Sequence, residues 1–226
     1  MIRGHVETLG DSPEERAEAI AVIQDELDRM SRYVSDLLVL AKAEQPDFLA
    51  PEAVDLGELT RDVLVRVRAL GARAWVLDGA PDVGEELVVA DPERLGQAVL
   101  NLAANAVQHT GEGNEIGVGA EISGSTVRLW VRDTGPGVDP AVAATLFDRY
   151  ARGATSRTRR PEGAGIGLSI VDAIARAHRG SVSVSTTSGD GATFAISIPL
   201  RRPPSMPPPA ASAPSAPAVT VQSGMR

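Results

Sequence analysis

The sequence contains no cysteine, which excludes disulfide frameworks, thiolate zinc sites and cysteine nucleophiles. Lysine is nearly missing as well, since Lys42 is the only lysine among 22 basic residues. Any contact to phosphate must therefore come from arginine, backbone amides or polar side chains. Long apolar runs are also lacking: an unbroken stretch such as Leu37 to Ala41 is far too short to cross a bilayer. The first residues hold no apolar segment of the kind found in secretory signals.

Positive charge is scarce overall. The formal net charge of −8 argues against a general nucleic-acid binder, which needs a basic surface. The apolar content of 43% and the charged content of 23% are ordinary for a globular chain. A length of 226 residues permits one core domain with a smaller appendage.

Composition and spacing divide the chain into four segments. We expect a helical segment at 1–46, a linker at 47–53, the main domain at 54–200 and a disordered tail at 201–226. The tail is predicted because the residues from Pro203 onward are mostly Pro, Ala and Ser, a composition that buries too little apolar surface to fold.

The helical segment carries an apolar seam with alternating spacings of three and four residues. Ser12-Pro13 marks its start as a cap with proline at the first helical position, and Gln45-Pro46 marks its end. This pattern is typical of a helical hairpin that is completed by a second copy. A single amphipathic helix lying on the main domain is the alternative. The seam residues are Ile20, Ile23, Leu27, Met30, Val34, Leu37 and Ala41.

The main domain mixes helical and strand patterns. We expect helices at 57–70, 92–109 and about 165–177, a short helix after Pro140, and strands at 74–77, 87–89, 116–122, 126–131, 181–186 and 192–198. Two antiparallel hairpins predict an α/β sandwich with one mixed sheet and helices on one face. A doubly wound parallel sheet is disfavoured because strands and helices do not alternate strictly.

Two glycine clusters are candidates for contact with a ligand. The run Asp133-Thr134-Gly135-Pro136-Gly137 follows a strand, and Gly163-Ala164-Gly165-Ile166-Gly167-Leu168 opens a helix. Glycine lets the backbone approach a ligand closely, and a helix N-terminus offers amides and a positive dipole end to phosphate. The second cluster is no dinucleotide-binding fingerprint, because it follows an arginine-rich loop and not a strand.

Two asparagines add a third element. Asn101 and Asn105 are four residues apart, so their amides project from one face of the predicted helix. Such a pair needs polar partners. These are either internal hydrogen bonds or a hard cation such as Mg²⁺, which takes few protein ligands and shares the others with water and phosphate oxygens.

In this order the elements resemble the ATP-binding catalytic domain of sensor histidine kinases, a branch of the Bergerat-fold ATPases. The resemblance covers roughly residues 54–200, and the segment at 1–46 is similar to the end of the family's dimerisation and histidine-phosphotransfer hairpin. Four family motifs have counterparts: the asparagine box at 101–110, the first glycine box at 133–139, the phenylalanine box at 146–150 and the second glycine box at 163–168.

The resemblance implies ATP and Mg²⁺ as cofactors and gives roles to the matching residues. Asp133 would accept a hydrogen bond from the adenine amino group, Asn105 would bind Mg²⁺, and Arg149 would reach the γ-phosphate, so that Asn105 and Arg149 serve catalysis. Residues 149–163 would form a lid. Further nucleotide contacts are expected from Asn101, Gln108, His109, Gly135, Gly137, Val138, Tyr150, Gly163, Gly165, Ile166, Gly167 and Leu168.

Three positions depart from the family pattern. Gln108 stands where the family commonly has a basic residue that reaches the phosphates, and His109 where it commonly has an aromatic residue beside adenine. Asn101 occupies the place of the glutamate that activates water in ATP-hydrolysing relatives. Since an amide cannot act as a general base, phosphoryl transfer to a protein fits better than hydrolysis.

The acceptor histidine of the family is carried in a box of His-acidic-x-Arg-Thr-Pro type. None of His5, His109 and His178 has that context. His178 ends a helix, where capping of the last carbonyls explains it, and His5 falls downstream of the expected acceptor position. We therefore expect the chain to begin just after the acceptor box and to phosphorylate a histidine outside it, not to phosphorylate itself.

Partners and alternatives follow from the same resemblance. We expect a homodimer through the helical hairpin, with a response regulator and an acceptor-histidine domain as partners, and neither nucleic acid nor a membrane segment. The expected location is the cytoplasm, either free or as the cytoplasmic part of a membrane-associated kinase. Two alternatives remain: a catalytically silent nucleotide-binding interaction module, and a serine kinase of the anti-sigma-factor type, which normally lacks the helical hairpin.

Overall fold

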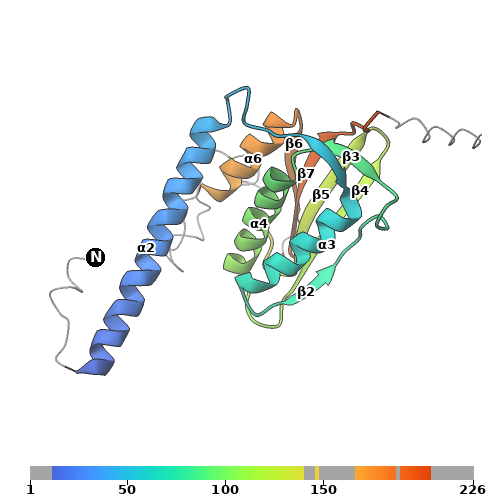
Figure 1. Cartoon of the computed structure of the whole chain (residues 1–226). Coiled ribbons are helices and arrows are strands. Elements are labelled where there is room, and N and C mark those ends of the chain that lie inside the picture. The colour runs from blue at the N-terminus through green and yellow to red at the C-terminus, as the bar shows by residue number, and fades with distance from the viewer. Residues whose placement is uncertain (1–11, 140–145, 148–165, 187–188, 205–226) are drawn as a thin grey trace, which may run out of the picture.

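The computed structural model describes residues 12–139, 146–147, 166–186 and 189–204. A long helix stands beside an α/β body (Figure 1). The helices are α2 (Pro13–Lys42), α3 (Leu56–Val67), the 3₁₀ helix η1 (Arg68–Leu70), α4 (Pro92–His109) and α6 (Gly167–Ala177). The strands are β1 (Glu52–Asp55), β2 (Ala74–Leu77), β3 (Leu87–Ala90), β4 (Glu115–Ser123), β5 (Thr126–Asp133), β6 (Ser181–Thr186) and β7 (Ala192–Pro199).

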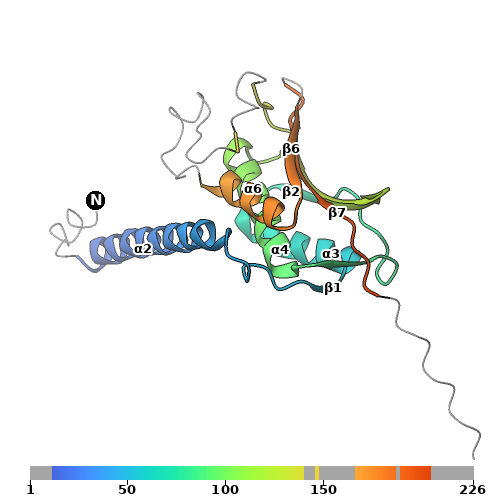
Figure 2. The same cartoon turned by 90° about the horizontal axis from the view of Figure 1, so that it is seen from above.

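The body is built on a five-stranded sheet in the order β2-β4-β5-β7-β6. β2 is parallel to β4, while the other pairs in this sheet are antiparallel. The helices α3, α4 and α6 lie on one face of it (Figure 2). This confirms the predicted α/β sandwich with a mixed sheet and helices on one face.

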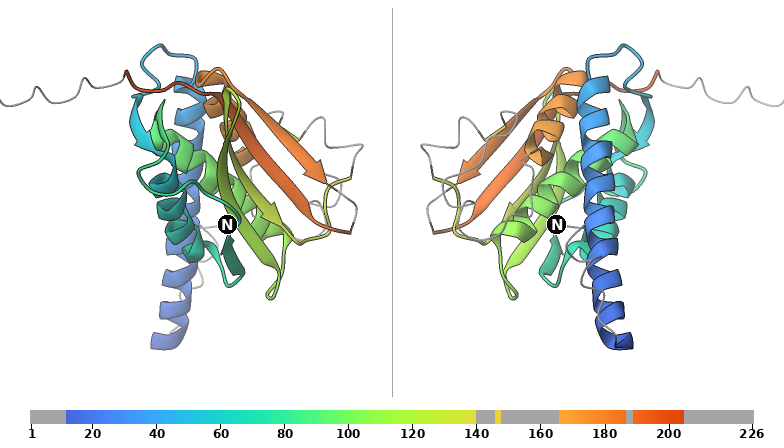
Figure 3. Two further views of the ribbon diagram at one scale, coloured as in Figure 1. Left: turned by 90° about the vertical axis from the view of Figure 1, so that its right-hand side faces the viewer. Right: turned by 90° about the vertical axis from the view of Figure 1, so that its left-hand side faces the viewer.

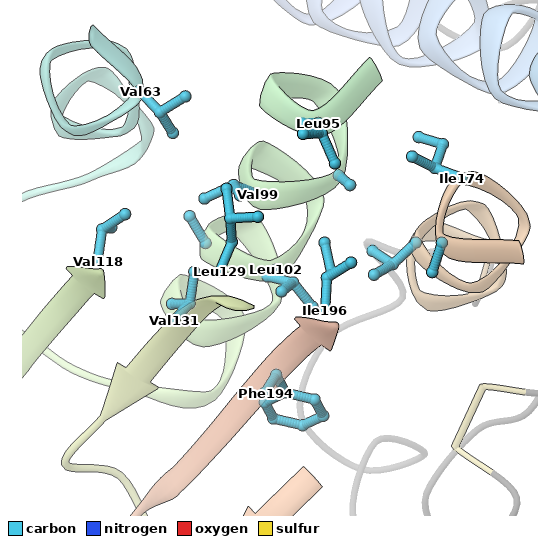
Figure 4. Close-up of a cluster of buried hydrophobic side chains, with 14 of the residues drawn as sticks. Val63, Leu95, Val99, Leu102, Val118, Leu129, Val131, Ile174, Phe194 and Ile196 are labelled. Carbon is cyan, nitrogen blue, oxygen red and sulfur yellow. The ribbon is translucent and has the colours of Figure 1, made fainter. Parts of the chain in front are cut away.

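The apolar core fills the space between the sheet and these helices. Valine, leucine, isoleucine and phenylalanine alternate along β5 and β7, so that every second side chain faces the helices. Leu95, Val99 and Leu102 of α4 lie at the centre, against Leu129 of β5 and Ile196 of β7 (Figure 4). α4 is thereby held over the middle of the sheet.

The predicted helix at 92–109 is confirmed at both ends. Its start is set by Asp91, whose Oδ1 accepts the backbone N–H of Arg94 at 2.9 Å, with Pro92 next to it in the first turn. The same Asp91 contacts two other segments. Its Oδ2 accepts the N–H of Ala50 at 2.8 Å, and its own N–H donates to Nε2 of His178 at 3.2 Å.

His178 lies at the end of α6, as predicted for a capping residue. Its Nδ1 donates to the carbonyl of Ile174 at 2.9 Å, because a carbonyl can only accept. Nε2 is then the acceptor for Asp91, so the ring is neutral with the proton on Nδ1. Burial lowers the pKa of His178 and keeps it in that form.

Within the described part of the chain, α2 packs on the body at its C-terminal end. Val39, Leu40 and Phe48 belong to the buried core of the body, and the guanidinium of Arg94 lies 4.6 Å from the Phe48 ring centroid. The seam further along is open to solvent: Leu27 is 53% and Val34 is 57% exposed. α2 therefore extends away from the body along most of its length (Figures 2 and 3).

Two boundaries differ from the sequence prediction, and two predicted elements lie outside the described residues. β1 is not among the predicted strands; it begins within the predicted linker and pairs antiparallel with β3 in a separate two-stranded sheet. Arg201 and Arg202, expected in the tail, contact the same region: the carbonyl of Arg201 accepts the N–H of Val89 at 2.6 Å, and Arg202 pairs with Glu86 at 3.1 Å.

The first helix of the hairpin and the short helix after Pro140 cannot be placed, since they fall outside the described ranges. No helix in the described part of the chain has the length and apolar content needed to span a membrane.

Candidate functional site

The two asparagines of α4 have different surroundings. Asn101 donates from Nδ2 to the carbonyl of Gln97 at 3.0 Å. Its Oδ1 faces the start of α6, where a Cβ added to Gly167 would lie only 3.2 Å away. Asn105 is half-buried, and its side-chain amide forms no hydrogen bond with another described residue. Internal hydrogen bonding therefore accounts for Asn101, whereas the amide of Asn105 keeps its capacity for a ligand.

Asp133 is the last residue of β5 and only 5% exposed. Its Oδ1 accepts the N–H of Gly135 at 2.8 Å. Burial is the main influence on this carboxyl and raises its pKa, while hydrogen bonds from the amides of Gly135 and Ala192 and the charges of His109 and Arg132 lower it. Asp133 is thus a buried carboxyl to which, in the described part of the chain, only backbone amides donate.

The first glycine cluster packs tightly between α4 and the start of β7. A Cβ on Gly135 would meet Asp133 Oδ1 at 2.8 Å, the His109 carbonyl at 3.1 Å and Thr110 Cγ2 at 3.2 Å. Gly137 has a φ of 76°, in the left-handed region that favours glycine. Asp133, Gly135 and His109 therefore lie next to one another, and their common role in a nucleotide site stays a prediction.

A residue that the sequence analysis missed anchors this cluster. Thr186, at the end of β6, accepts the N–H of Val138 at 2.8 Å through Oγ1 and donates to the carbonyl of Gly191 at 3.0 Å. The N–H of Gly189 also donates to the carbonyl of Pro136 at 3.1 Å. Nothing in the local sequence around Thr186 signals these contacts, because Val138 lies 48 residues away.

The remaining predicted residues divide into described and undescribed ones. Gln108 and His109 are exposed in the last turn of α4, Val138 and Leu168 are half-buried, and Ile166 precedes α6 without a side-chain cap. Phe147 of the phenylalanine box packs edge-to-face on Phe194, with ring centroids 6.3 Å apart. Arg149, Tyr150, Gly163 and Gly165 lie outside the described residues, as does His5.

The side chains of the candidate site suit an Mg²⁺ ion only if water and a nucleotide supply most of its ligands. No group of three or more His, Asp or Glu side chains that could hold a metal ion occurs within the described ranges. A single neutral amide such as that of Asn105 fits a cation that takes its other ligands from water and phosphate oxygens.

Comparison with family models gives two matches. Residues 90–202 match the family of histidine kinase-, DNA gyrase B- and HSP90-like ATPases. Residues 1–46 match the His Kinase A (phospho-acceptor) domain. The second match includes His5, which is at odds with our expectation that the acceptor box is missing from this segment.

Individual relatives agree with these matches. The probable sensor histidine kinase TcrY of Mycobacterium tuberculosis is 37% identical over 203 residues, which cover 88% of this chain and 42% of TcrY. Among solved structures, full-length ShkA in complex with AMPPNP is similar with a TM-score of 0.67 at 30% identity, over 88% of this chain and 42% of ShkA. ThkA in complex with the response regulator TrrA has a TM-score of 0.67 at 25% identity, over 88% of this chain and 57% of ThkA. This chain thus spans less than half the length of TcrY and ShkA.

Proposed function

The chain belongs to the family of histidine kinase-, DNA gyrase B- and HSP90-like ATPases, on its sensor histidine kinase branch, and we propose that it binds Mg-ATP and transfers the γ-phosphoryl group to a protein histidine. The observation that carries this proposal is the buried carboxyl of Asp133 at the end of the central strand. It lies beside Gly135, which packs so closely on the His109 carbonyl and Thr110 that a side chain would not fit, and so beside the end of the helix that carries two asparagines.

Asp133 supplies the base-binding end of the site. A carboxylate offers about four acceptor positions, of which the amides of Gly135 and Ala192 use part. The adenine amino group is a donor and would take another. The lack of a side chain on Gly135 lets this turn pass close to both Asp133 and the end of α4. His109, exposed at the end of α4, would stack on the base.

Asn105 and the start of α6 supply the phosphate end. Asn105 would give Mg²⁺ its one protein ligand, and the ion would neutralise charge on the phosphates during transfer. The first amides of α6 have no side-chain cap among the described residues, so they are available to phosphate oxygens. Gln108 would donate a hydrogen bond there, and we assign Arg149 to the γ-phosphate.

We infer that the site transfers the γ-phosphoryl group to a protein and does not hydrolyse ATP, because Asn101 stands where hydrolysing relatives have a glutamate. Its amide is engaged by the Gln97 carbonyl and faces Gly167. It has no basic site with which to activate water. Positioning and charge stabilisation dominate phosphoryl transfer, so a site of this kind can act on an imidazole that is brought to it.

We place the acceptor histidine outside the sequence of this chain, because none of its three histidines has the acidic and Thr-Pro context of an acceptor box. The match of residues 1–46 to the phospho-acceptor domain makes His5 the competing choice. A catalytically silent binding module is the second candidate function, favoured by the same lack of an acceptor box.

We further propose a homodimer through α2 and a response regulator as the next partner. The exposed seam at Leu27 and Val34 suits a four-helix bundle made by two copies. Binding of TrrA by ThkA is the precedent for a regulator.

The test is incubation with γ-labelled Mg-ATP, first alone and then with a separate polypeptide that carries an intact acceptor helix. We expect no acid-labile label on the chain alone, and label on the added polypeptide. Label on the isolated chain that is lost in His5→Ala would overturn the transfer in trans. Nucleotide binding without label in either arm would favour the silent module, and acid-stable label would indicate a serine kinase.

A further inference from the structure

Arg73 makes an unusual set of hydrogen bonds with the end of α4. It lies half-buried between η1 and β2. Its Nε donates to Thr110 Oγ1 at 3.0 Å, and Nη2 donates to the carbonyls of Val107 at 3.1 Å and Thr110 at 2.9 Å. The guanidinium thus forms hydrogen bonds to a turn that is 34 to 37 residues away in the sequence.

These hydrogen bonds satisfy backbone carbonyls at the C-terminal end of α4. The last carbonyls of a helix have no partner within it, and a positive charge there is favoured by the helix dipole. α4 ends without a glycine cap, since Thr110 follows in an extended conformation. Thr110 Oγ1 donates back to the carbonyl of Ala106 at 2.7 Å, so Arg73 and Thr110 together close the last turn of α4.

The closed turn forms one wall of the candidate base-binding site. The His109 carbonyl and Thr110 Cγ2 are the atoms that a side chain on Gly135 would strike, at 3.1 and 3.2 Å. Gly135 in turn donates its N–H to Asp133. A chain of direct contacts therefore runs from Arg73 through Thr110 and Gly135 to the carboxyl of Asp133.

The segment around Arg73 is itself fixed to this wall. Gly71 lies against Val107, because a Cβ there would be 3.2 Å from Val107 Cγ1. Trp75 donates from Nε1 to the carbonyl of Gly71 at 3.0 Å. The N–H of Ala74 donates to the carbonyl of Asn114 at 3.0 Å. Residues 71–75 are thus fixed against α4 and β4, so the guanidinium of Arg73 has a defined position at the end of α4.

We propose that Arg73 is a positioning residue for the base-binding end of the nucleotide site. It acts through Thr110 and Gly135 on Asp133, and its hydrogen bonds to described residues include none to Asn105 or the start of α6. The proposal rests on the proposed nucleotide function. It assigns adenine selectivity in part to a residue outside the four sequence motifs.

The main experiment compares Arg73→Gln with the matched control Arg61→Gln. Arg61 also donates to backbone carbonyls, those of Gly57 at 2.9 Å and Pro81 at 3.0 Å, but makes none of its hydrogen bonds to α4. We expect Arg73→Gln to weaken ADP binding about three- to tenfold and to reduce the preference for ADP over GDP, as the loss of one or two net hydrogen bonds would. Binding of Mg-tripolyphosphate should not change. Arg61→Gln should leave all three affinities as in the original chain.

Two further measurements separate positioning from general destabilisation. Thr110→Val removes the acceptor of Arg73 Nε, so the effects of Arg73→Gln and Thr110→Val on ADP affinity should be less than additive. Amide hydrogen exchange without nucleotide should show faster exchange at Gly135 in Arg73→Gln but not in Arg61→Gln.

Unchanged ADP selectivity together with unchanged exchange at Gly135 would overturn the assignment. If the original chain binds no nucleotide, the proposed function fails, and exchange at Gly135 still decides whether Arg73 sets the position of the turn.

Discussion

Asp133→Asn separates ligand binding from stability, because the two depend on different properties of the same buried carboxyl. The amide keeps one oxygen that can accept the Gly135 N–H, now at 2.8 Å. It replaces the other oxygen with a donor, which would face the donor group of adenine. We expect adenine nucleotides to lose about 1.5 to 3 kcal/mol of binding free energy, the range for a hydrogen bond to a charged group, or roughly 10- to 100-fold in affinity.

The same substitution is expected not to lower stability. Burial raises the pKa of Asp133, so the folded state holds the proton more firmly than the unfolded state does. Stability from this group is therefore present at low pH and lost as pH rises through the folded pKa. A neutral amide removes that loss at neutral pH. The melting temperature of Asp133→Asn should equal or exceed that of the original chain.

Asp78→Asn is the matched control. Asp78 accepts hydrogen bonds from Arg132 and Trp130, and the Arg132 bond lowers its pKa most. Its stabilising contribution is present above the unfolded pKa and lost on acidification. We expect Asp78→Asn to lower the melting temperature at neutral pH and to leave the preference for adenine intact.

The assays are calorimetric titration with ADP and GDP, and thermal unfolding at neutral pH. Affinity of the original chain for ADP should also fall as pH drops through the pKa of Asp133, while Asp133→Asn should show a flat profile there. If Asp133→Asn keeps its preference for adenine over guanine, the contact is refuted. If it unfolds at a much lower temperature than the original chain, the reasoning about burial is wrong.

Three other perturbations test separate parts of the molecule. Asn105→Ala should remove the part of ADP affinity that depends on Mg²⁺, so titrations with and without EDTA should agree in the variant and differ in the original chain. Leu27→Asp combined with Val34→Asp should give a monomer that still binds nucleotide, as sedimentation would show; an unchanged mass would exclude the seam of α2 as the dimer contact. Burial lowers the pKa of His178, so its contribution to stability is present above the unfolded pKa and declines as pH falls below it. His178→Gln should therefore weaken the dependence of the melting temperature on pH between about pH 7 and 5, as thermal unfolding at a series of pH values would show.

Local signals predicted the helices and the large sheet well. The start of α4 was predictable because Asp91 is a capping residue and Pro92 suits the first helical turn, and both effects are confined to one turn. The hairpin of β4 and β5 was visible because alternation and a Gly-Ser turn lie next to each other in the sequence. β1 was missed because it has four residues, of which only Val54 is buried, and its pairing partner β3 is far along the chain.

The candidate site was predicted less completely, for a physical reason. The sequence motifs contain the residues that would touch the nucleotide, but not those that hold them in place. Arg73 and Thr186 act through hydrogen bonds to backbone atoms, which any sequence provides at every position. Such contacts leave no pattern of residue types, so only the fold reveals them.

Three aspartates at strand ends show how the fold assigns function to identical side chains. Asp91 uses its oxygens to cap α4 and to hold Ala50. Asp78 uses its oxygens on Arg132 and Trp130. Asp133 is as buried as Asp91, and among the described residues backbone amides donate to both. At Asp133 the effect of burial outweighs these hydrogen bonds and raises the pKa. A buried carboxyl whose pKa is raised in this way is costly to keep ionised, and a donor brought by a ligand would offset that cost. This property, together with its place in a glycine-rich motif, is the reason we propose that nucleotide recognition depends on Asp133.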